Sequence, residues 1–232
     1  MFATTKVAER SLVRLPDGSE VHLGPASSLR TVAGFGNGAR EVELSGEAVF
    51  RVQHDAARPF RIRAAGAVIE DLGTVFVVRA VMQEPLRVAV SEGSVSVGRA
   101  GTPAGRATVL NPRDVAFLSD TGDAIVQRDV DVDRYSAWAR ERVELIFDNM
   151  PLRSVFAELE RWYDVKFEVT DPAVLSRTLN APVAGVSIDE VLQVMNTALE
   201  LRFERDGRVV RLAVPVRTGM TPQSAPQVGG GA

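Results

Sequence analysis

The sequence contains no cysteine and only two histidines, His22 and His54. Without thiols, the chain can form no disulfide, no thiolate zinc site and no cysteine nucleophile. A histidine-based metal site needs two or more ligands at short, regular spacing, and neither histidine has a neighbour of that kind. We therefore expect no bound metal and no cofactor.

Long apolar runs are also missing. No stretch approaches the roughly 18–20 residues that a helix needs to cross a bilayer. Residues 1–6, MFATTK, do not show the charged and then apolar segments of a signal peptide. The net charge of −3 argues against a general nucleic-acid binder, which usually carries a basic face.

Catalytic motifs are absent as well. The sequence holds no nucleophile elbow, no P-loop and no glycine-rich turn between a strand and a helix. Glu47, between a glycine and an apolar strand, could be a buried carboxylate, but no second carboxylate stands at a credible spacing for acid–base chemistry. We expect Glu47 to accept hydrogen bonds from N–H groups of a turn, and we expect no catalytic residue and no enzyme.

Residues 11–126 are dominated by short alternating segments separated by turns. Proline presets one backbone angle and glycine supplies positive φ in the turn PDGS at residues 16–19. Residues 41–44 and 48–52 are predicted as two successive strands, with Gly46 at their junction. Four glycines are expected at strand junctions that need positive φ or a close backbone approach: Gly18, Gly46, Gly73 and Gly93. No helical period fits this region, so residues 1–130 are predicted to form an all-β domain, a barrel or a solenoid-like roll of short strands.

The pattern changes after residue 129. A short linking helix is predicted at residues 134–142, and Trp138 within it is a candidate for sealing two domains together. The order that follows is βαβ and then βαββ, with Pro151 opening the first helix and a capping box at residues 187–190 opening the second. We predict a small α+β domain at residues 131–216, one sheet with two helices. Residues 217–232 are rich in Gly, Pro, Ser and Gln and are predicted to be a disordered tail.

Both parts resemble one family, the FecR-type sigma-factor regulators. The first part carries five of its phrases in order: LPDGS at residues 15–19, REVELSGEAVF at 40–50, RPF at 58–60, LGTVF at 72–76 and VAVSEGSV at 88–95. The second part is similar to the secretin/TonB short N-terminal fold, with FDNMPL at residues 147–152, followed by Arg161 and Tyr163.

This resemblance implies a function in transmembrane signalling. Family members are single-pass inner-membrane proteins, and the chain resembles their exported part. The resemblance therefore implies a periplasmic location and a membrane contact only through an N-terminal helix that lies outside this sequence. The implied partner is the periplasmic signalling domain of an outer-membrane TonB-dependent transporter, often one for a ferric chelate. An extracytoplasmic-function sigma factor would be bound by a cytoplasmic segment that is also outside this sequence.

Small α/β modules can bind partners by adding a strand to a sheet edge. We place the candidate partner site on the hairpin predicted at residues 201–214. Its candidate residues are Phe203 and the arginines that alternate with the apolar residues of the hairpin: Arg202, Arg205, Arg208 and Arg211. Two other functions stay open: an envelope β-protein that binds carbohydrate or another ligand, and a structural subunit of the secretin type. The first predicts clustered aromatic residues or paired carboxylates, although aromatic residues make up only 6% of the chain, and the second predicts self-assembly.

Overall fold

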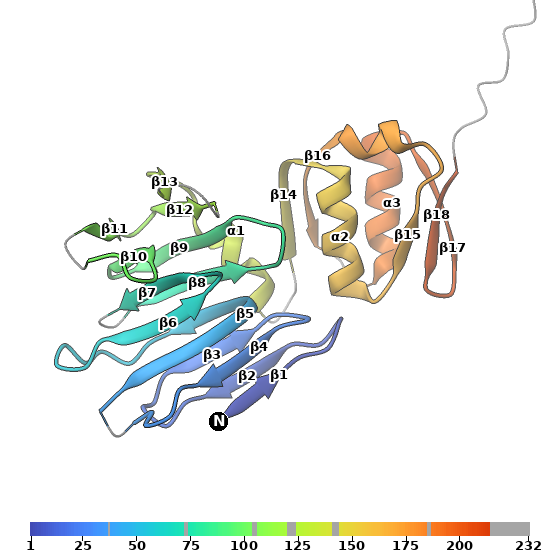
Figure 1. Ribbon diagram of the computed structural model, residues 1–232. Coiled ribbons are helices and arrows are strands. Elements are labelled where there is room, and N and C mark those ends of the chain that lie inside the picture. Colours follow the sequence, from blue (N-terminus) through green and yellow to red (C-terminus); the bar gives the residue numbers. More distant parts are fainter. Residues whose placement is uncertain are drawn as a thin grey trace, which may run out of the picture.

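The computed structural model describes residues 1–36, 38–71, 74–103, 106–119, 124–140, 144–184 and 187–213. Figure 1 shows two parts, a large β domain and a smaller domain of helices and strands, joined by a short linker. The predicted tail, residues 217–232, and the predicted turn glycine Gly73 lie outside the described residues. None of the described helices is both long and apolar enough to span a membrane.

The β domain is built from strands β1 to β13. Their bounds are β1 Phe2–Thr4, β2 Ser11–Arg14, β3 Glu20–Leu23, β4 Ser28–Thr31, β5 Arg40–Arg51, β6 Phe60–Ala64, β7 Ala67–Asp71, β8 Val75–Ala80, β9 Leu86–Glu92, β10 Val95–Arg99, β11 Thr108–Leu110, β12 Val115–Leu118 and β13 Ala124–Gln127. Their pairing makes one branched sheet with the main order β11-β10-β7-β6-β5-β8-β9-β12-β13.

Strand β5 is the branch point of this sheet. Its first half pairs with β4 and β6, and its second half pairs with β3 and β8. The two predicted strands in this region are therefore one strand of 12 residues. Gly46, with φ of 98°, lies where the halves meet, and a Cβ there would come within 2.7 Å of the Cα of Ser27. Only glycine fits this conformation and this close approach.

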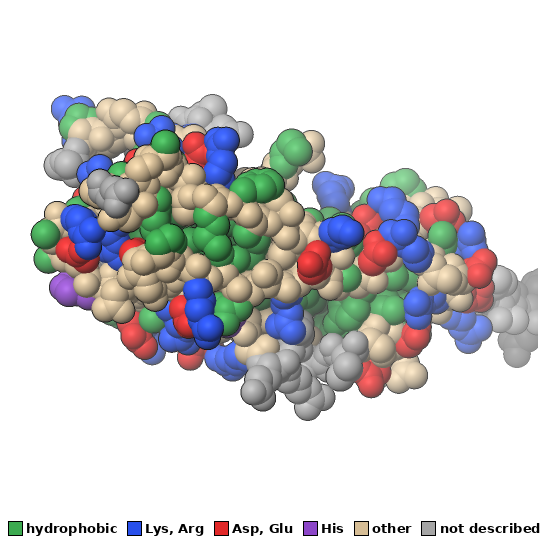
Figure 2. Space-filling view, turned by 90° about the horizontal axis from the view of Figure 1, so that it is seen from below, with side chains coloured by type: hydrophobic (Ala, Val, Ile, Leu, Met, Phe, Trp, Pro, Cys, Tyr) green, Lys and Arg blue, Asp and Glu red, His purple; other side chains and the backbone are tan. Residues whose placement is uncertain are grey.

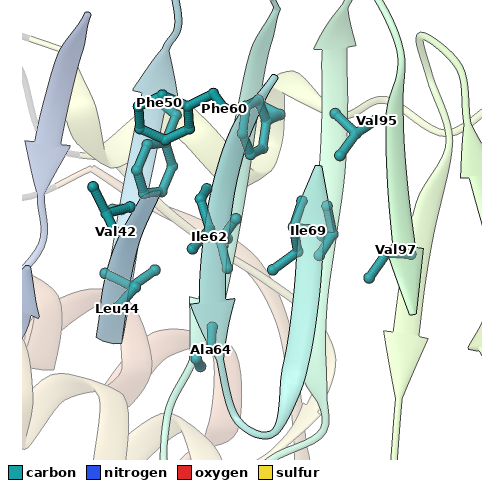
Figure 3. Packing of buried hydrophobic residues seen from close by; sticks show 14 of the residues in the cluster. Val42, Leu44, Phe50, Phe60, Ile62, Ala64, Ile69, Val95 and Val97 are labelled. Carbon is teal, nitrogen blue, oxygen red and sulfur yellow. The ribbon is translucent and has the colours of Figure 1, made fainter. Parts of the chain in front are cut away.

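The core of the β domain lies between the two halves of the branched sheet. Alternate residues of each strand point inward, as in β6, where Phe60, Ile62 and Ala64 are buried and the residues between them are exposed. Figure 3 shows these side chains beside those of the neighbouring strands β5, β7 and β10, on the same face of the sheet. The ring of Phe50 stacks on that of Phe76, with centroids 5.3 Å apart.

A linker covers part of the outer face of this sheet. It consists of α1, Asp133–Ser136, and a 3-10 turn, η2, Ala137–Ala139. Trp138 of the linker is buried in a cluster with Val49 and Val77 of the β domain. The same cluster continues into the core of the second domain. Apolar burial is therefore continuous across the junction.

The described residues of the second domain form two α-helices, one 3-10 turn and five strands. Its elements are β14 Glu144–Pro151, α2 Leu152–Tyr163, β15 Lys166–Glu168, η3 Pro172–Ser176, β16 Thr178–Ala184, α3 Ile188–Leu199, β17 Arg202–Asp206 and β18 Val209–Ala213. The predicted element order is therefore found. The capping box is present too, because the Ser187 side chain accepts from the N–H of Glu190 and the Glu190 carboxylate accepts from the N–H of Ser187.

The strands of this domain form two sheets, which corrects the prediction of one. Strand β14 pairs only with β16, whereas β15, β18 and β17 form a separate sheet in that order. Pro182 in β16 has no N–H to donate to a further strand. The N–H of Phe167 in β15 donates to the Glu160 side chain at 2.8 Å. Both features oppose a continuous ladder between the two sheets.

Candidate functional site: a charge network between the domains

Three charged residues lie side by side on the outer face of the β domain. Glu47 in β5 is opposite Arg79 in β8, and Arg79 is opposite Arg87 in β9. Directly opposed residues on neighbouring strands put their side chains on the same face of a sheet. This rung of the sheet therefore presents one carboxylate and two guanidinium groups to the second domain.

Helix α2 contributes the opposing charges. Its apolar stripe, which includes Leu152, Val155 and Leu159, is buried in the second domain. Glu158 and Arg161 are three positions apart, so they lie on one side of the helix. Both side chains are about nine-tenths buried.

The carboxylate of Glu47 is the centre of the network. Its side chain is 2% exposed, and its Oε2 accepts from Arg79 at 2.9 Å and from Arg161 at 2.7 Å. Its Oε1 accepts from Arg87 at 3.2 Å. One buried carboxylate is therefore shared by guanidinium groups from both domains. This corrects the prediction that Glu47 accepts from turn N–H groups.

Glu158 forms the second bridge between the domains. Arg79 Nη1 and Nη2 donate to its two oxygens at 3.1 and 2.7 Å, a two-point contact between a planar guanidinium and a carboxylate. Its Oε1 also accepts from Arg161 and from the indole N–H of Trp162, each at 2.7 Å. Arg79 also forms an ion pair at 2.8 Å with Glu84, whose side chain is partly exposed.

The pKa values show that the charges stabilise one another. Burial alone would raise the pKa of Glu158, but the neighbouring Arg79 and Arg161 hold it well below its usual 4.5. Burial alone would lower the pKa of Arg79 and Arg161, but the carboxylates of Glu47 and Glu158 raise both instead. Glu158 is therefore an ionised anion over the ordinary pH range.

Arg87 is the exception in this group. Burial lowers its pKa more than Glu47 raises it. Its guanidinium lies 4.5 Å from the ring centroid of Tyr135 in the linker, a cation–π contact. Arg87 and Trp138 both line a cavity of about 60 Å³ at the junction. Buried N–H groups of these two side chains, Arg87 Nε and Trp138 Nε1, have no partner among the described residues.

Further contacts hold the domains together around the network. The N–H of Ala8 donates to the carbonyl of Arg161 at 3.0 Å, and the Arg161 guanidinium donates to the carbonyl of Pro25 at 2.9 Å. The indole rings of Trp138 and Trp162 are 5.7 Å apart. Trp138 thus lies between the domains, where the sequence made it a candidate seal. The arrangement is suited to coupling two domains, and its charges are neutralised by one another.

The predicted partner residues lie elsewhere, on the hairpin of β17 and β18. Three of the arginines form exposed ion pairs: Arg205 with Asp189, Arg208 with Asp164 and Arg211 with Glu168. Arg202 is exposed and forms no ion pair with any described residue. Figure 2 shows charges of both signs interspersed over this domain on the face drawn there.

Phe203 differs from its arginine neighbours. It is 8% exposed, and its ring makes edge contacts with Phe156 at 6.0 Å and Phe167 at 6.1 Å. Its side chain is therefore part of the core, and only its backbone lies at the sheet edge. The candidate site on this hairpin consists of arginine side chains and backbone groups.

The sequence reasoning missed Arg79, Arg87 and Glu158. A signal for Arg79 was present, because a lone arginine stands in the otherwise apolar run of β8. Charged residues are rarely buried unless they are paired, so such a residue indicates a hidden partner. Glu158 and Arg161 gave no such signal, because they are two of four charged residues on an amphipathic helix.

Known proteins share both domains. A family model described as "FecR protein" matches residues 2–96, and one described as "FecR, C-terminal" matches residues 144–212. No curated protein sequence matches the chain. A crystal structure of a "putative anti-sigma factor" from Parabacteroides distasonis ATCC 8503 is similar to it with a TM-score of 0.80 and 26% identity, over 92% of this chain and 98% of that one. Another with the same description has a TM-score of 0.79 and 28% identity, over 91% and 97%.

The chain is therefore a two-domain protein in which a β domain and a small α/β domain are joined by a buried charge network. Two family models match it in order, one on each domain. The chain belongs to the FecR family. The Glu47–Arg161 pair of the network joins the LSGEAVF phrase of the first match to the region of the second.

Proposed function

We propose that this chain is the periplasmic, signal-sensing part of a transmembrane sigma-factor regulator. The observation that carries the proposal is the ordered match of both family models, on residues 2–96 and 144–212. The likeness to a "putative anti-sigma factor" over 92% of the chain supports it, because that likeness spans both domains and their junction.

The proposed partner is the periplasmic signalling domain of an outer-membrane TonB-dependent transporter. The proposed target of the regulator is an extracytoplasmic-function sigma factor. Such a relay needs two binding surfaces and a connection between them, and it needs no catalytic group, metal or cofactor. We therefore propose that the protein is not an enzyme.

The charge network supports a relay between the domains. Arg79 and Arg161 each contact carboxylates from both domains. Separating the domains would break the Arg79–Glu158 and Glu47–Arg161 pairs and would expose apolar side chains of the cluster around Trp138 to water, so separation is opposed. The two domains therefore move as one body while this junction is intact. A partner that binds the second domain would in this way also act on the β domain.

Binding to isolated signalling domains of TonB-dependent transporters tests the proposal. We expect one domain of a panel to bind the chain, and an Arg208→Glu, Arg211→Glu variant to bind it about tenfold more weakly, because an interface charge is reversed. The matched control is Arg61→Glu, Arg63→Glu, which reverses two exposed, ion-paired arginines of the β domain. Failure of every domain in the panel to bind would contradict the proposed function. Equal losses of affinity in both variants would show that the binding site is not on the hairpin.

A further inference from the structure

The second domain has four strand edges at which a partner strand could be added. Three of them are closed. Strand β14 packs against α1 and η2 at the junction with the β domain. Strand β16 contains Pro182, which lacks the N–H that a ladder requires. At β15 the N–H of Phe167 donates to the carboxylate of Glu160, which Lys166 also contacts at 3.0 Å.

The edge of β17 is closed in a weaker way. The N–H of Phe203 donates at 3.0 Å to Oδ1 of Asn196 in α3. A neutral amide forms weaker hydrogen bonds than a carboxylate does. The Asn196 side chain has no other hydrogen bond among the described residues. The Phe203 N–H is turned away from β18, so by strand periodicity the Arg205 N–H also faces outward.

We propose that Asn196 is a displaceable cap on the β17 edge, and that the partner adds an extended strand to β17 by replacing the Asn196 amide at Phe203. This inference rests on the proposed function, since it names how the same hairpin would bind. Displacement converts a closed edge into a ladder, with the N–H groups of Phe203 and Arg205 as donors. The closed cap keeps the edge from pairing with other chains in the absence of the partner.

The incoming strand has a defined chemistry. Arg202 lies at the start of β17, is exposed and has no ion-pair partner among the described residues. Arg205, two residues on, is paired with Asp189. A carboxylate side chain opposite Arg202 would complete the pattern of ion pairs on this hairpin. The occupant is therefore an extended segment of the partner protein that bears an acidic residue at that position.

Two substitutions of Asn196 predict opposite effects on affinity. Asn196→Ala removes the cap, so the signalling domain that binds the wild-type chain should bind about three- to tenfold more tightly, the equivalent of one hydrogen bond. Asn196→Asp makes the cap charged, like that of Glu160, and should weaken binding by a similar factor. Gln193→Ala, an exposed amide on the same helix, should leave the affinity unchanged. Calorimetric titration measures all four proteins, with circular dichroism to confirm folding.

The outcomes separate this inference from the proposed function. If a signalling domain binds the wild-type chain and the Asn196 variants bind with the same affinity as Gln193→Ala, the cap is refuted and the proposed function stands. If no signalling domain binds, the proposed function fails. Sedimentation equilibrium then tests whether Asn196 caps the β17 edge. An uncapped edge should then make Asn196→Ala self-associate more strongly than Gln193→Ala. Equal sedimentation of the two variants would refute the cap in that case.

Discussion

Glu47 shows how strongly one buried side chain depends on its partners. Its carboxylate accepts from Arg79, Arg87 and Arg161, which are guanidinium groups from two strands and one helix. Removal of one member of a buried ion network leaves the remaining charges uncompensated, which is far more costly than the loss of an exposed pair. This residue also belongs to the phrase that the first family model matches.

We expect Glu47→Ala to lower the free energy of unfolding by about 3–5 kcal/mol, the usual cost of breaking a buried pair. Glu84→Ala is the control, because Glu84 contacts only Arg79 of the network and is 42% exposed. Its effect should be below about 1 kcal/mol. Urea denaturation of both variants checks this, and equal effects would show that Glu47 is not the centre of the network.

Glu158 makes stability depend on pH in a predictable direction. Its pKa in the folded protein lies well below the usual 4.5, so the unfolded chain takes up a proton first as the pH falls. The stabilisation is complete above about pH 5 and is lost as the pH falls from there toward the folded pKa. In Glu158→Gln this contribution is absent at every pH. The difference in unfolding free energy between wild type and variant should therefore shrink below pH 5, and parallel profiles would contradict the assignment.

The limits of sequence reasoning are clear at this scale. The three arginines that donate to Glu47 are 32, 40 and 114 residues away from it along the chain. Nothing in the local sequence pairs them, because their meeting depends on strand register and on how α2 docks. Glycine and capping residues are different, since their roles depend on neighbours in sequence. Gly18, Gly46 and Gly93 have the positive φ expected of them, and the capping box at Ser187 forms as predicted.

Among the elements, β5 explains the architecture of the β domain. It supplies pairing edges to four other strands, two on each half, and thereby joins the two halves of the sheet. Such sharing requires the strand to change direction without ending. Gly46 supplies this change, which is why a residue expected at a junction between strands lies inside one.

Gly46→Ala should therefore be more harmful than another substitution at positive φ. The conformation alone costs about 1–2 kcal/mol for a residue with a Cβ. Crowding against Ser27, whose backbone Cα would lie at 2.7 Å, adds about 1–3 kcal/mol. Gly18→Ala is the control, because Gly18 also has positive φ but has no atom within 4 Å of a Cβ. Thermal unfolding compares the two, and equal shifts in Tm would exclude a special role for Gly46.

Element prediction succeeded where a local period was strong. Helices α2 and α3 and the β17–β18 hairpin carry clear apolar stripes or turn residues, and they form as expected. Strands β1, β4 and β13 were missed because they are three or four residues long and have little alternation. The division of the second domain into two sheets was missed because it depends on Pro182 and on the side-chain cap at Phe167.

At the scale of the whole molecule, apolar burial is continuous across the junction between the two domains. Trp138 and Trp162 meet there, and one apolar cluster includes residues of both domains. The ion network adjoins this cluster and is closed to solvent on most sides. We propose that a binding event on the second domain is transmitted to the β domain through this junction.

Hydrogen–deuterium exchange of the whole chain, with and without a saturating signalling domain of a TonB-dependent transporter, tests this claim most directly. We predict slower exchange in β17, Arg202–Asp206, where the partner is bound, together with altered exchange in β5 and β8 around Glu47 and Arg79. Both changes should be absent with a signalling domain that does not bind. Protection confined to β17, with β5 and β8 unchanged, would contradict coupling between the domains, and protection that spares β17 altogether would contradict the proposed binding site.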